Sequence, residues 1–167
     1  MAKHKTLAFF IPHRGCPHQC SFCDQRTISG TVHAPEPEEI TQTCREMLER
    51  SGTLESAEIA FFGGSFTGIP INEQSELLAA ANEYLKKGDI DGIRLSTRPD
   101  YIDKEILDNL LKYGVTTIEL GVQSMDDSVL KSSNRGHTRE DVINAVKLIK
   151  EYPFTLGLQM MTGLPGD

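Results

Sequence analysis

The feature that most constrains this chain is a regular alternation of short apolar runs with amphipathic stretches of helical period. Five apolar runs have the length of β-strands, and they occupy residues 6–12, 57–62, 90–97, 115–122 and 154–161. Most of them are continuously apolar, as expected of strands that are buried on both faces. Polar residues interrupt the last two runs, among them Glu119 and Gln159, and these must find partners or face a cavity. The pattern predicts β/α units around a parallel sheet.

The stretches between these runs show the signals of four main helices. Pro37 suits the first turn of the first helix, and Gly52 follows its end. Asn72 and Asp103 are the predicted N-caps of the second and third helices, and Thr138 begins a predicted capping box ahead of the fourth. The residues predicted to face inward are Ile40, Cys44, Met47 and Leu48, then Leu77, Leu78, Ala81 and Leu85, then Ile106, Leu107, Leu110 and Leu111, and finally Val142, Val146 and Ile149. Burial of each large apolar side chain stabilises the folded state by about 1.5–3 kcal/mol. Packing in the core, rather than ligand binding, therefore explains these apolar stripes.

The order of elements predicts an α/β fold, a partial TIM-type (β/α) barrel with parallel strands. We expect residues 1–167 to form one domain, the N-terminal portion of a barrel that is truncated after the fifth strand, because residues 164–167 read as a turn and no helix follows. In such a barrel the functional residues lie at the carboxyl ends of the strands, where the connecting loops meet.

The composition limits the class of protein and the partners that this chain can have. Hydrophobic residues make up 38% of the chain and charged residues 25%, which is typical of a soluble globular protein. The longest apolar run, residues 7–12, is too short to cross a membrane, and no secretory signal is present, so we expect a cytoplasmic protein. The formal net charge of −7 means that a nucleic-acid partner would need a local basic patch or another region of the protein.

Three cysteines follow the first predicted strand within eight residues. Cys16, Cys20 and Cys23 have the spacing C-x3-C-x2-C, and a reducing compartment keeps them as thiols or thiolates. Thiolates are the ligands of iron–sulfur clusters, and a cubane contains four irons. Three cysteines would leave one iron open to a small chelating ligand. The loop therefore predicts a [4Fe-4S] cluster with an accessible iron.

Two other interpretations of this loop stay open at the level of the sequence. A structural zinc site would recruit His13 or His18 as a fourth ligand, although zinc ligands usually come in two separated pairs. A redox dithiol would join Cys20 and Cys23. Cys44 is different, because it lies on the apolar stripe of the first helix and is expected to act as a small hydrophobe.

The ends of the later strands carry further candidate ligand-binding residues. Gly63 and Gly64 follow the second strand, where a paired glycine lets the backbone approach a ligand closely, although it is more often a simple turn. Ser96 and Thr97 end the third strand and are expected to line the ligand side. Arg98 can pair with a carboxylate. Gln123, after the fourth strand, offers both a donor and an acceptor.

The cysteine loop resembles the signature of the radical S-adenosylmethionine (SAM) superfamily, including the aromatic Phe22 before the last cysteine. The resemblance implies that the amine and carboxylate of S-adenosyl-L-methionine chelate the open iron, and that reductive cleavage by an external electron donor gives a 5′-deoxyadenosyl radical. It also implies that the glycine pair binds the amino group of SAM, with Ser65 at a position where many members carry an acidic residue. Arg135 is then expected to hold the methionine carboxylate, the alternative being an exposed turn arginine.

Four longer segments are more specific than the cysteine signature. They are Ser-Thr-Arg-Pro-Asp at 96–100, Glu-Leu-Gly-Val-Gln-Ser at 119–124, Asn-Arg-Gly-His-Thr at 134–138 and Gly-Leu-Pro-Gly-Asp at 163–167. Together with the segment Gly-Gly-Ser-Phe-Thr-Gly, they resemble the radical domain of the Elongator catalytic subunit family and its bacterial relatives. That resemblance implies modification of the wobble uridine of tRNA through regions beyond this domain, since the acetyltransferase domain of that family is absent here. The alternatives are a coproporphyrinogen oxidase-like protein and a non-catalytic iron–sulfur electron carrier.

Overall fold

A computed structural model describes residues 4–11, 16, 18–23, 34–51 and 56–167, and the statements below concern these residues. Five strands form one parallel sheet in the order β1-β2-β3-β4-β5. The strands are β1 (His4–Ile11), β2 (Ser56–Gly63), β3 (Gly92–Thr97), β4 (Thr117–Gln123) and β5 (Thr155–Met160). This sequential order is that of an arc of a β/α barrel, whereas a flavodoxin-like sheet would place β2 outside β1. The predicted parallel α/β architecture is confirmed.

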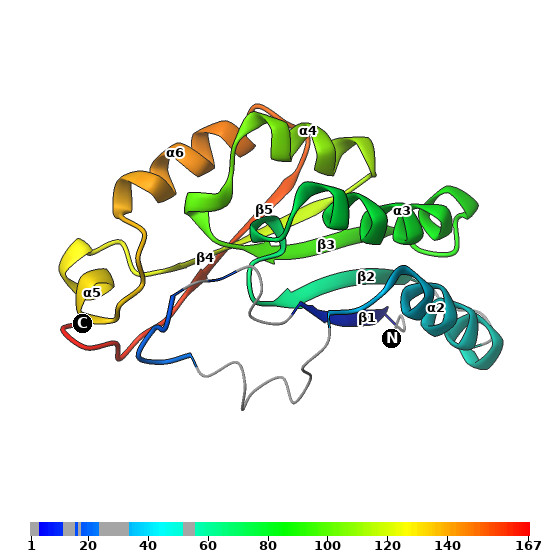
Figure 1. Cartoon of the computed structure of the whole chain (residues 1–167), viewed down its shortest axis with the longest axis horizontal. Coiled ribbons are helices and arrows are strands. Elements are labelled where there is room, and N and C mark those ends of the chain that lie inside the picture. Colours follow the sequence, from blue (N-terminus) through cyan, green and yellow to red (C-terminus); the bar gives the residue numbers. More distant parts are fainter. Residues whose placement is uncertain (1–3, 12–15, 17, 24–33, 52–55) are drawn as a thin grey trace.

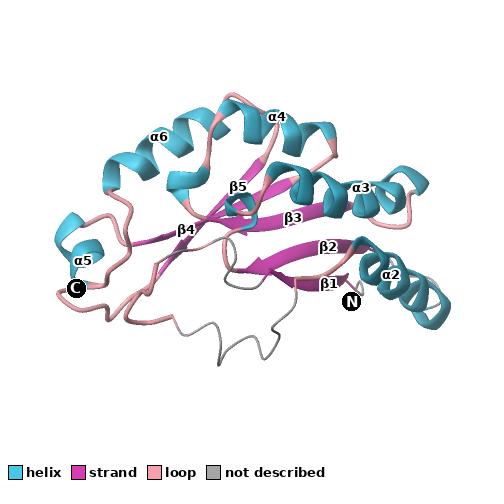
Figure 2. Cartoon of the chain, in the orientation of Figure 1, coloured by secondary structure: helices cyan, strands magenta, loops and turns pink. Residues whose placement is uncertain are grey.

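Helices alternate with the strands and gather on one side of the sheet. They are α2 (Pro37–Ser51), α3 (Ile71–Lys87), α4 (Lys104–Lys112), α5 (Asp127–Ser132) and α6 (Arg139–Ile149), with 3-10 turns η2 (Phe66–Gly68) and η3 (Pro99–Tyr101). Figure 1 shows α3, α4 and α6 over one face of the sheet, and Figure 2 shows that no described helix covers the opposite face. The short helix α5 was not predicted, because six residues are too few to show a helical period. None of the helices in the described ranges has the length and apolar character needed to span a membrane.

The core lies between the sheet and these helices. Its large, fully buried strand residues include Ile59, Phe61, Ile93, Leu95, Ile118, Leu120 and Val122 on the three central strands and Ile11 at the end of β1. Most of the predicted helical stripes pack against them, and Cys44 is completely buried among apolar side chains, as predicted. Leu48 and Leu111 were wrongly predicted to face inward: they are 38% and 43% exposed, because each lies at the edge of its stripe.

Helix capping agrees with the sequence at two helices and differs at one. Asp103 Oδ1 accepts a hydrogen bond from Ile106 N at 2.8 Å, and the capping box at Thr138 is present. The prediction that Asn72 caps α3 is wrong, because α3 already begins at Ile71 with Pro70 as its N-cap. The Pro70 carbonyl accepts the first helical hydrogen bond, from Gln74 N. The predicted boundaries at Pro12 and Gly52 lie outside the described residues.

The helix-free face of the sheet carries a row of polar side chains, one from each strand. Thr6 Oγ1 donates to Glu58 Oε1 at 3.1 Å, and the Arg94 guanidinium contacts Glu58 Oε2 at 3.2 Å. Arg94 Nη1 also donates to Glu119 Oε1 at 2.6 Å. Gln159 Nε2 then donates to Glu119 Oε2 at 2.6 Å. We call this row the strand ladder; it supplies the partners that Glu119 and Gln159 were predicted to need.

The strand ladder is expected to contribute to stability through its central arginine. Replacing Arg94 with Met leaves the two carboxylates facing each other without a shared donor, and we expect a loss of about 1–3 kcal/mol in the free energy of unfolding. Urea denaturation measures this. Arg50→Met is the control, because Arg50 is 78% exposed in its side chain and pairs with Glu46 at 3.5 Å on the helix surface. Equal loss in both variants would contradict a stabilising role for the ladder.

Candidate functional site

The predicted site residues meet at the carboxyl ends of the strands, around one cavity of about 110 Å³. The cavity is lined by Cys16, His18, Cys20, Phe22, Cys23, Gly63, Gly64, Ser96, Thr97, Arg98, Gly121, Gln123, Arg135 and Gln159. These include all of the site residues predicted from the sequence except Ser65. Since sites that enclose a small ligand usually measure about 300–1,000 Å³, the described residues form only part of the wall of such a site.

The cysteine loop contributes three sulfur atoms to this cavity. Cys20 is buried, while Cys16 and Cys23 are half-buried, and a hydrogen bond of 3.1 Å from Cys23 N to Cys20 O tightens the end of the loop. Two of the sulfurs each have an arginine guanidinium beside them. Arg98 Nη1 is 4.0 Å from Cys16 Sγ, and Arg135 Nη1 is 3.8 Å from Cys20 Sγ. Two of the three sulfurs therefore have a cationic side chain within contact distance.

The three cysteines do not converge on a single point. Among the described residues there is no group of three or more His, Cys, Asp or Glu side chains that could hold one metal ion. A cubane does not require such convergence, because each thiolate binds a different iron. His13, one of the zinc ligands considered above, lies outside the described residues, and His18 lines the cavity beside the cysteines.

The glycine pair joins the end of β2 to the end of β1. Gly63 has φ 103°, and a Cβ there would lie 2.6 Å from the carbonyl oxygen of Ile11. Gly64 N donates to the same oxygen at 2.8 Å. Only glycine allows this approach with this backbone conformation. The pair therefore has a structural role in placing β2 against the start of the cysteine loop, and it also exposes backbone to the cavity.

Arg98 is held rigidly beneath the cysteine loop. Its Nε and Nη2 atoms donate to the two carboxylate oxygens of Asp100, both at 2.9 Å, as the predicted pairing with a carboxylate requires. Burial lowers the pKa of Arg98, but its hydrogen bond to Asp100 and the charge of that carboxylate outweigh this and raise the pKa. Ser65 is completely buried: its Oγ accepts from Arg98 N at 3.2 Å and lies 2.7 Å from Thr97 Oγ1. Ser65 thus supports Arg98 from below and does not face the cavity.

Gln123 and Arg135 each bring an unsatisfied polar atom to the site. Gln123 has φ 70°, an uncommon conformation for a residue with a side chain, at the centre of a tight turn in which Ser124 N donates to Val122 O. Its Oε1 is buried, and so is Arg135 Nε, and neither has a hydrogen-bond partner among the described residues. Buried polar atoms without partners are costly, and both of these belong to residues that line the cavity, where a bound group can reach them. Arg135 Nη2 donates to Gly121 O at 2.6 Å, which rules out the alternative of an exposed turn arginine.

His137 supports this region from behind. It is buried, and its Nε2 lies 3.1 Å from Val122 O, so Nε2 carries the proton that it donates to this carbonyl. Burial, with the charges of Arg135 and Arg98, lowers the pKa of His137 to about 4. The neutral ring therefore anchors the residues that follow α5 to the end of β4.

The low pKa of His137 predicts an acid-sensitive fold. The unfolded chain binds a proton at this histidine near pH 6.5, while the folded protein does so only near pH 4. Its contribution to stability is therefore lost as the pH falls from about 6.5 to about 4. His137→Gln keeps a donor for Val122 but does not titrate, so its urea midpoint should fall less between pH 7 and pH 5 than that of the wild type. Parallel pH dependence in the two proteins would contradict this.

The sequence did not predict that Gly121 and His18 would line the cavity. His18 was considered only as a zinc ligand. Gly121 lies under Arg135, and a Cβ there would be 2.8 Å from Arg135 Nη2. The Gly-Val-Gln-Ser segment contains the signal for Gly121, because a glycine inside a strand often marks a close approach by another group. No sequence signal placed the His18 ring.

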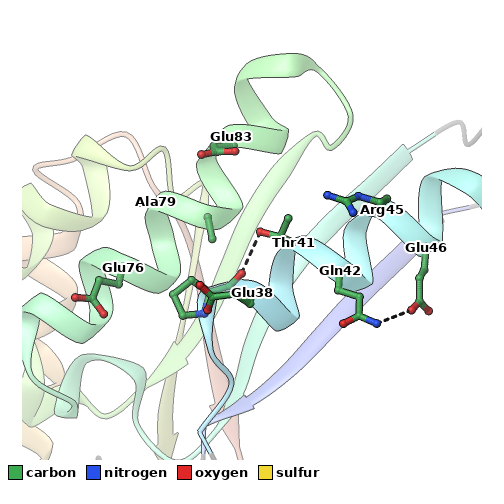
Figure 3. Close-up of a pocket in the computed structure, with 10 residues that line it drawn as sticks. Glu38, Thr41, Gln42, Arg45, Glu46, Glu76, Ala79 and Glu83 are labelled. Carbon is green, nitrogen blue, oxygen red and sulfur yellow. Dashed lines mark hydrogen bonds between the residues drawn. The ribbon is translucent and has the colours of Figure 1, made fainter.

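A larger cavity, of about 800 Å³, lies away from the strand ends, between α2 and α3 (Figure 3). The charged side chains of its wall are mainly acidic: Glu38, Glu46, Glu76 and Glu83 accompany a single arginine, Arg45. It contains no cysteine, and its carboxylates lie on the outer surface of two helices. The candidate site is therefore the smaller cavity at the strand ends.

Comparison with known proteins identifies the family. The model of the radical SAM superfamily matches residues 10–167 of this chain. The chain belongs to the radical SAM superfamily. Radical SAM enzymes use a [4Fe-4S] cluster and S-adenosylmethionine, so the predicted enzyme class and the two predicted cofactors are confirmed at the level of the family.

Within the radical SAM superfamily, the similar sequences include Elongator proteins. A tRNA uridine(34) acetyltransferase of Methanocaldococcus infernus is 29% identical over 189 residues, covering 91% of this chain and 35% of the relative. Elongator complex protein 3 of Schizosaccharomyces pombe is 30% identical over 196 residues, covering 92% of this chain and 36% of the relative. The chain therefore spans about a third of the length of these relatives.

Solved radical SAM structures share the fold. The Methanocaldococcus infernus Elp3 structure superposes with a TM-score of 0.70 at 24% identity, over 100% of this chain and 40% of that one. Coproporphyrinogen III oxidase of Escherichia coli superposes with a TM-score of 0.65 at 19% identity, over 99% of this chain and 39% of that one. At these identities the structures establish the fold alone, and they do not separate the two branches.

Proposed function

We propose that Cys16, Cys20 and Cys23 bind a [4Fe-4S] cluster and that the chain uses it to cleave S-adenosylmethionine reductively. The observation that supports this most is the composition of the cavity wall: three cysteines share it with two guanidiniums and with two buried polar atoms that have no partner among the described residues. The donor set suits a cluster bound by thiolates, with an amino acid-like group beside it.

The remaining residues of the wall suit the parts of S-adenosylmethionine. Backbone at Gly63 and Gly64 is assigned to the amino group, and Arg135, through its unpaired Nε, to the methionine carboxylate. The free Oε1 of Gln123 accepts a hydrogen bond from the ligand, and the hydroxyl of Ser96 lines the same wall. Phe22 is half-buried beside Cys23 and restricts the access of water to the sulfurs.

The chemistry requires one electron from outside the chain. When bound, the reduced cluster supplies the electron that breaks a carbon–sulfur bond of S-adenosylmethionine, which gives methionine and a 5′-deoxyadenosyl radical. The partner is accordingly an external electron donor. We also infer a cytoplasmic location, because a reducing compartment keeps cysteine ligands as free thiols before the cluster is assembled.

Cysteine variants test the ligand assignment. Alanine at Cys16, Cys20 or Cys23 is expected to reduce the iron and sulfide content after anaerobic reconstitution to near zero, because each variant removes one of three thiolate ligands. Cys44→Ala is the matched control: Cys44 is buried away from the cavity, and burial raises its pKa to about 11, so it remains an unreactive thiol. A fully loaded Cys20→Ala protein would refute the assignment.

Electron paramagnetic resonance of the reduced, reconstituted protein tests the reaction. The cluster signal is expected to shift when S-adenosylmethionine is added, and 5′-deoxyadenosine should accumulate in the presence of a reductant. A cluster signal that does not respond to S-adenosylmethionine would favour an electron carrier. Zinc in place of iron after anaerobic purification would refute the proposal as a whole.

We further propose that the substrate of the complete protein is a tRNA uridine. The support is the set of Elongator relatives together with the four sequence segments that resemble them. The chain itself has a net charge of −7, so tRNA would be bound through other regions, and we infer that residues 1–167 form one radical SAM domain within a larger barrel. Exposed Leu158 and Met160 on β5 provide a surface for the next part of that barrel.

The full-length protein, once loaded, tests the proposed tRNA substrate. Unmodified tRNA is expected to increase the rate of 5′-deoxyadenosine formation, whereas tRNA with the wobble uridine replaced by cytidine should not. Stimulation by a porphyrinogen instead would assign the protein to the coproporphyrinogen oxidase-like branch.

A further inference from the structure

The cysteine loop is seated on the turn that follows α5. This turn, residues 133–137, contacts the loop at three points. The carbonyl oxygen of Ser133 accepts a hydrogen bond from Ser21 N at 3.1 Å, and Arg135 Nη1 lies 3.8 Å from Cys20 Sγ. The third contact is between His18 and Gly136. We call residues 133–137 the docking turn.

The docking turn is itself held firmly in place. Asn134, with φ 53°, ends α5 in a left-handed conformation, and Arg135 N donates to Leu130 O at 2.9 Å. The side chain of Arg135 reaches Gly121 O on β4, and the ring of His137 reaches Val122 O. The turn is therefore a rigid extension of the sheet, against which a loop can be positioned.

Gly136 presents bare backbone to the ring of His18. A Cβ at residue 136 would lie 2.3 Å from His18 Cε1, 2.5 Å from Nδ1 and 2.8 Å from Nε2. All three distances are well inside van der Waals contact, so any side chain at this position would displace the ring. His18 also lines the cavity with Cys16 and Cys20, so a displaced ring would alter the cavity wall beside the sulfurs.

We propose that Gly136 is a positioning residue for the iron–sulfur cluster, because its bare backbone seats His18 and thereby sets the position of the loop from Cys16 to Cys23. The inference rests on the proposed function, in which this loop binds the cluster. Gly136 touches neither cluster nor substrate in this role. It acts through His18, and Ser133 acts in the same way through the backbone of Ser21.

The competing explanation is that residue 136 must be glycine only because of its backbone. Gly136 has φ 87°, which side chains rarely adopt. Gly88 provides a matched control, since it has φ 77° at the C-cap of α3 and a Cβ there would meet nothing within 4 Å. Gly88→Ala introduces the backbone strain without the contact, and Gly136→Ala introduces both.

The experiment compares Gly136→Ala, Gly88→Ala, His18→Ala and the double variant Gly136→Ala/His18→Ala in the full chain. Urea denaturation first establishes that each variant folds. Before reconstitution, the alkylation rate of Cys20 is measured peptide by peptide, since Cys20 is buried in the seated loop. After reconstitution, the rate of iron loss to a chelator and the paramagnetic spectrum of the reduced cluster are recorded.

The proposal predicts that Gly136→Ala alone unseats the loop. Alkylation of Cys20 should be about tenfold faster than in the wild type, as expected when an opening equilibrium shifts by about 1.4 kcal/mol. Iron loss should accelerate to a similar extent, and the spectrum should change. Gly88→Ala should match the wild type in all three measurements. Removing the His18 ring should make the Gly136→Ala substitution nearly neutral, so that the double variant resembles His18→Ala.

Three results would overturn the proposal. They are wild-type alkylation of Cys20 in Gly136→Ala, equal effects of the two glycine substitutions, and a double variant in which Gly136→Ala adds its full effect to that of His18→Ala. If the wild type takes up no cluster, the proposed function fails, and the alkylation rates still decide whether Gly136 seats the loop. A normally loaded wild type with an unaffected Gly136→Ala variant would refute the positioning role and leave the proposed function intact.

Discussion

The pairing of β1 with β2 determines where the site can form. Ile11 is the last residue of β1, it pairs with Gly63, and its carbonyl oxygen accepts the hydrogen bond from Gly64 N. The cysteine loop follows β1, so this close approach fixes the point from which the loop departs. A side chain at residue 63 would collide with the Ile11 carbonyl and separate the two strand ends. The position of the sulfurs therefore depends on a backbone contact as well as on the cysteine spacing.

The guanidiniums of Arg98 and Arg135 both place positive charge beside cysteine sulfurs, but their hydrogen-bond partners differ. Arg98 is paired with Asp100 through two hydrogen bonds, so its net electrostatic effect on Cys16 is reduced. Arg135 binds a backbone carbonyl and has no carboxylate partner among the described residues, so its full charge faces Cys20 and the cavity. This difference explains why Arg135 suits an anionic ligand, whereas Arg98, already paired with Asp100, has a structural role beside the cysteine loop.

The sequence was most informative where function depends on local spacing. The cysteines, the glycine pair, Arg98 and Gln123 are close to strand ends along the chain, and parallel strands bring such ends together. Arg135 follows α5, and it was singled out through the resemblance of its segment to the family. Interactions that depend on packing between distant segments could not be predicted. The burial of Ser65 beneath Thr97 and the seat of His18 on Gly136 are of this kind, because each joins residues more than thirty positions apart.

Other differences arise where local rules compete. Asn72 is a good capping residue by type, but Pro70 ends the preceding segment two residues earlier, and α3 begins after it. Leu48 and Leu111 fit a helical stripe by spacing, yet the width of the buried face decides whether the edge of a stripe is covered. These positions depend on the neighbouring elements, which a single stretch of sequence does not specify.

The strand ladder also has a consequence for how the chain finds its native pairing. Each of the five strands contributes one member to it, and the links shift along the sheet from Thr6 on β1 to Gln159 on β5. If a strand slips by one residue, its side chains exchange faces, and its ladder member turns toward the apolar helices. A slipped β3 would bury the charge of Arg94 and leave two carboxylates without their shared partner. The ladder thus penalises misaligned sheets and selects the one alignment in which the strand ends form the site.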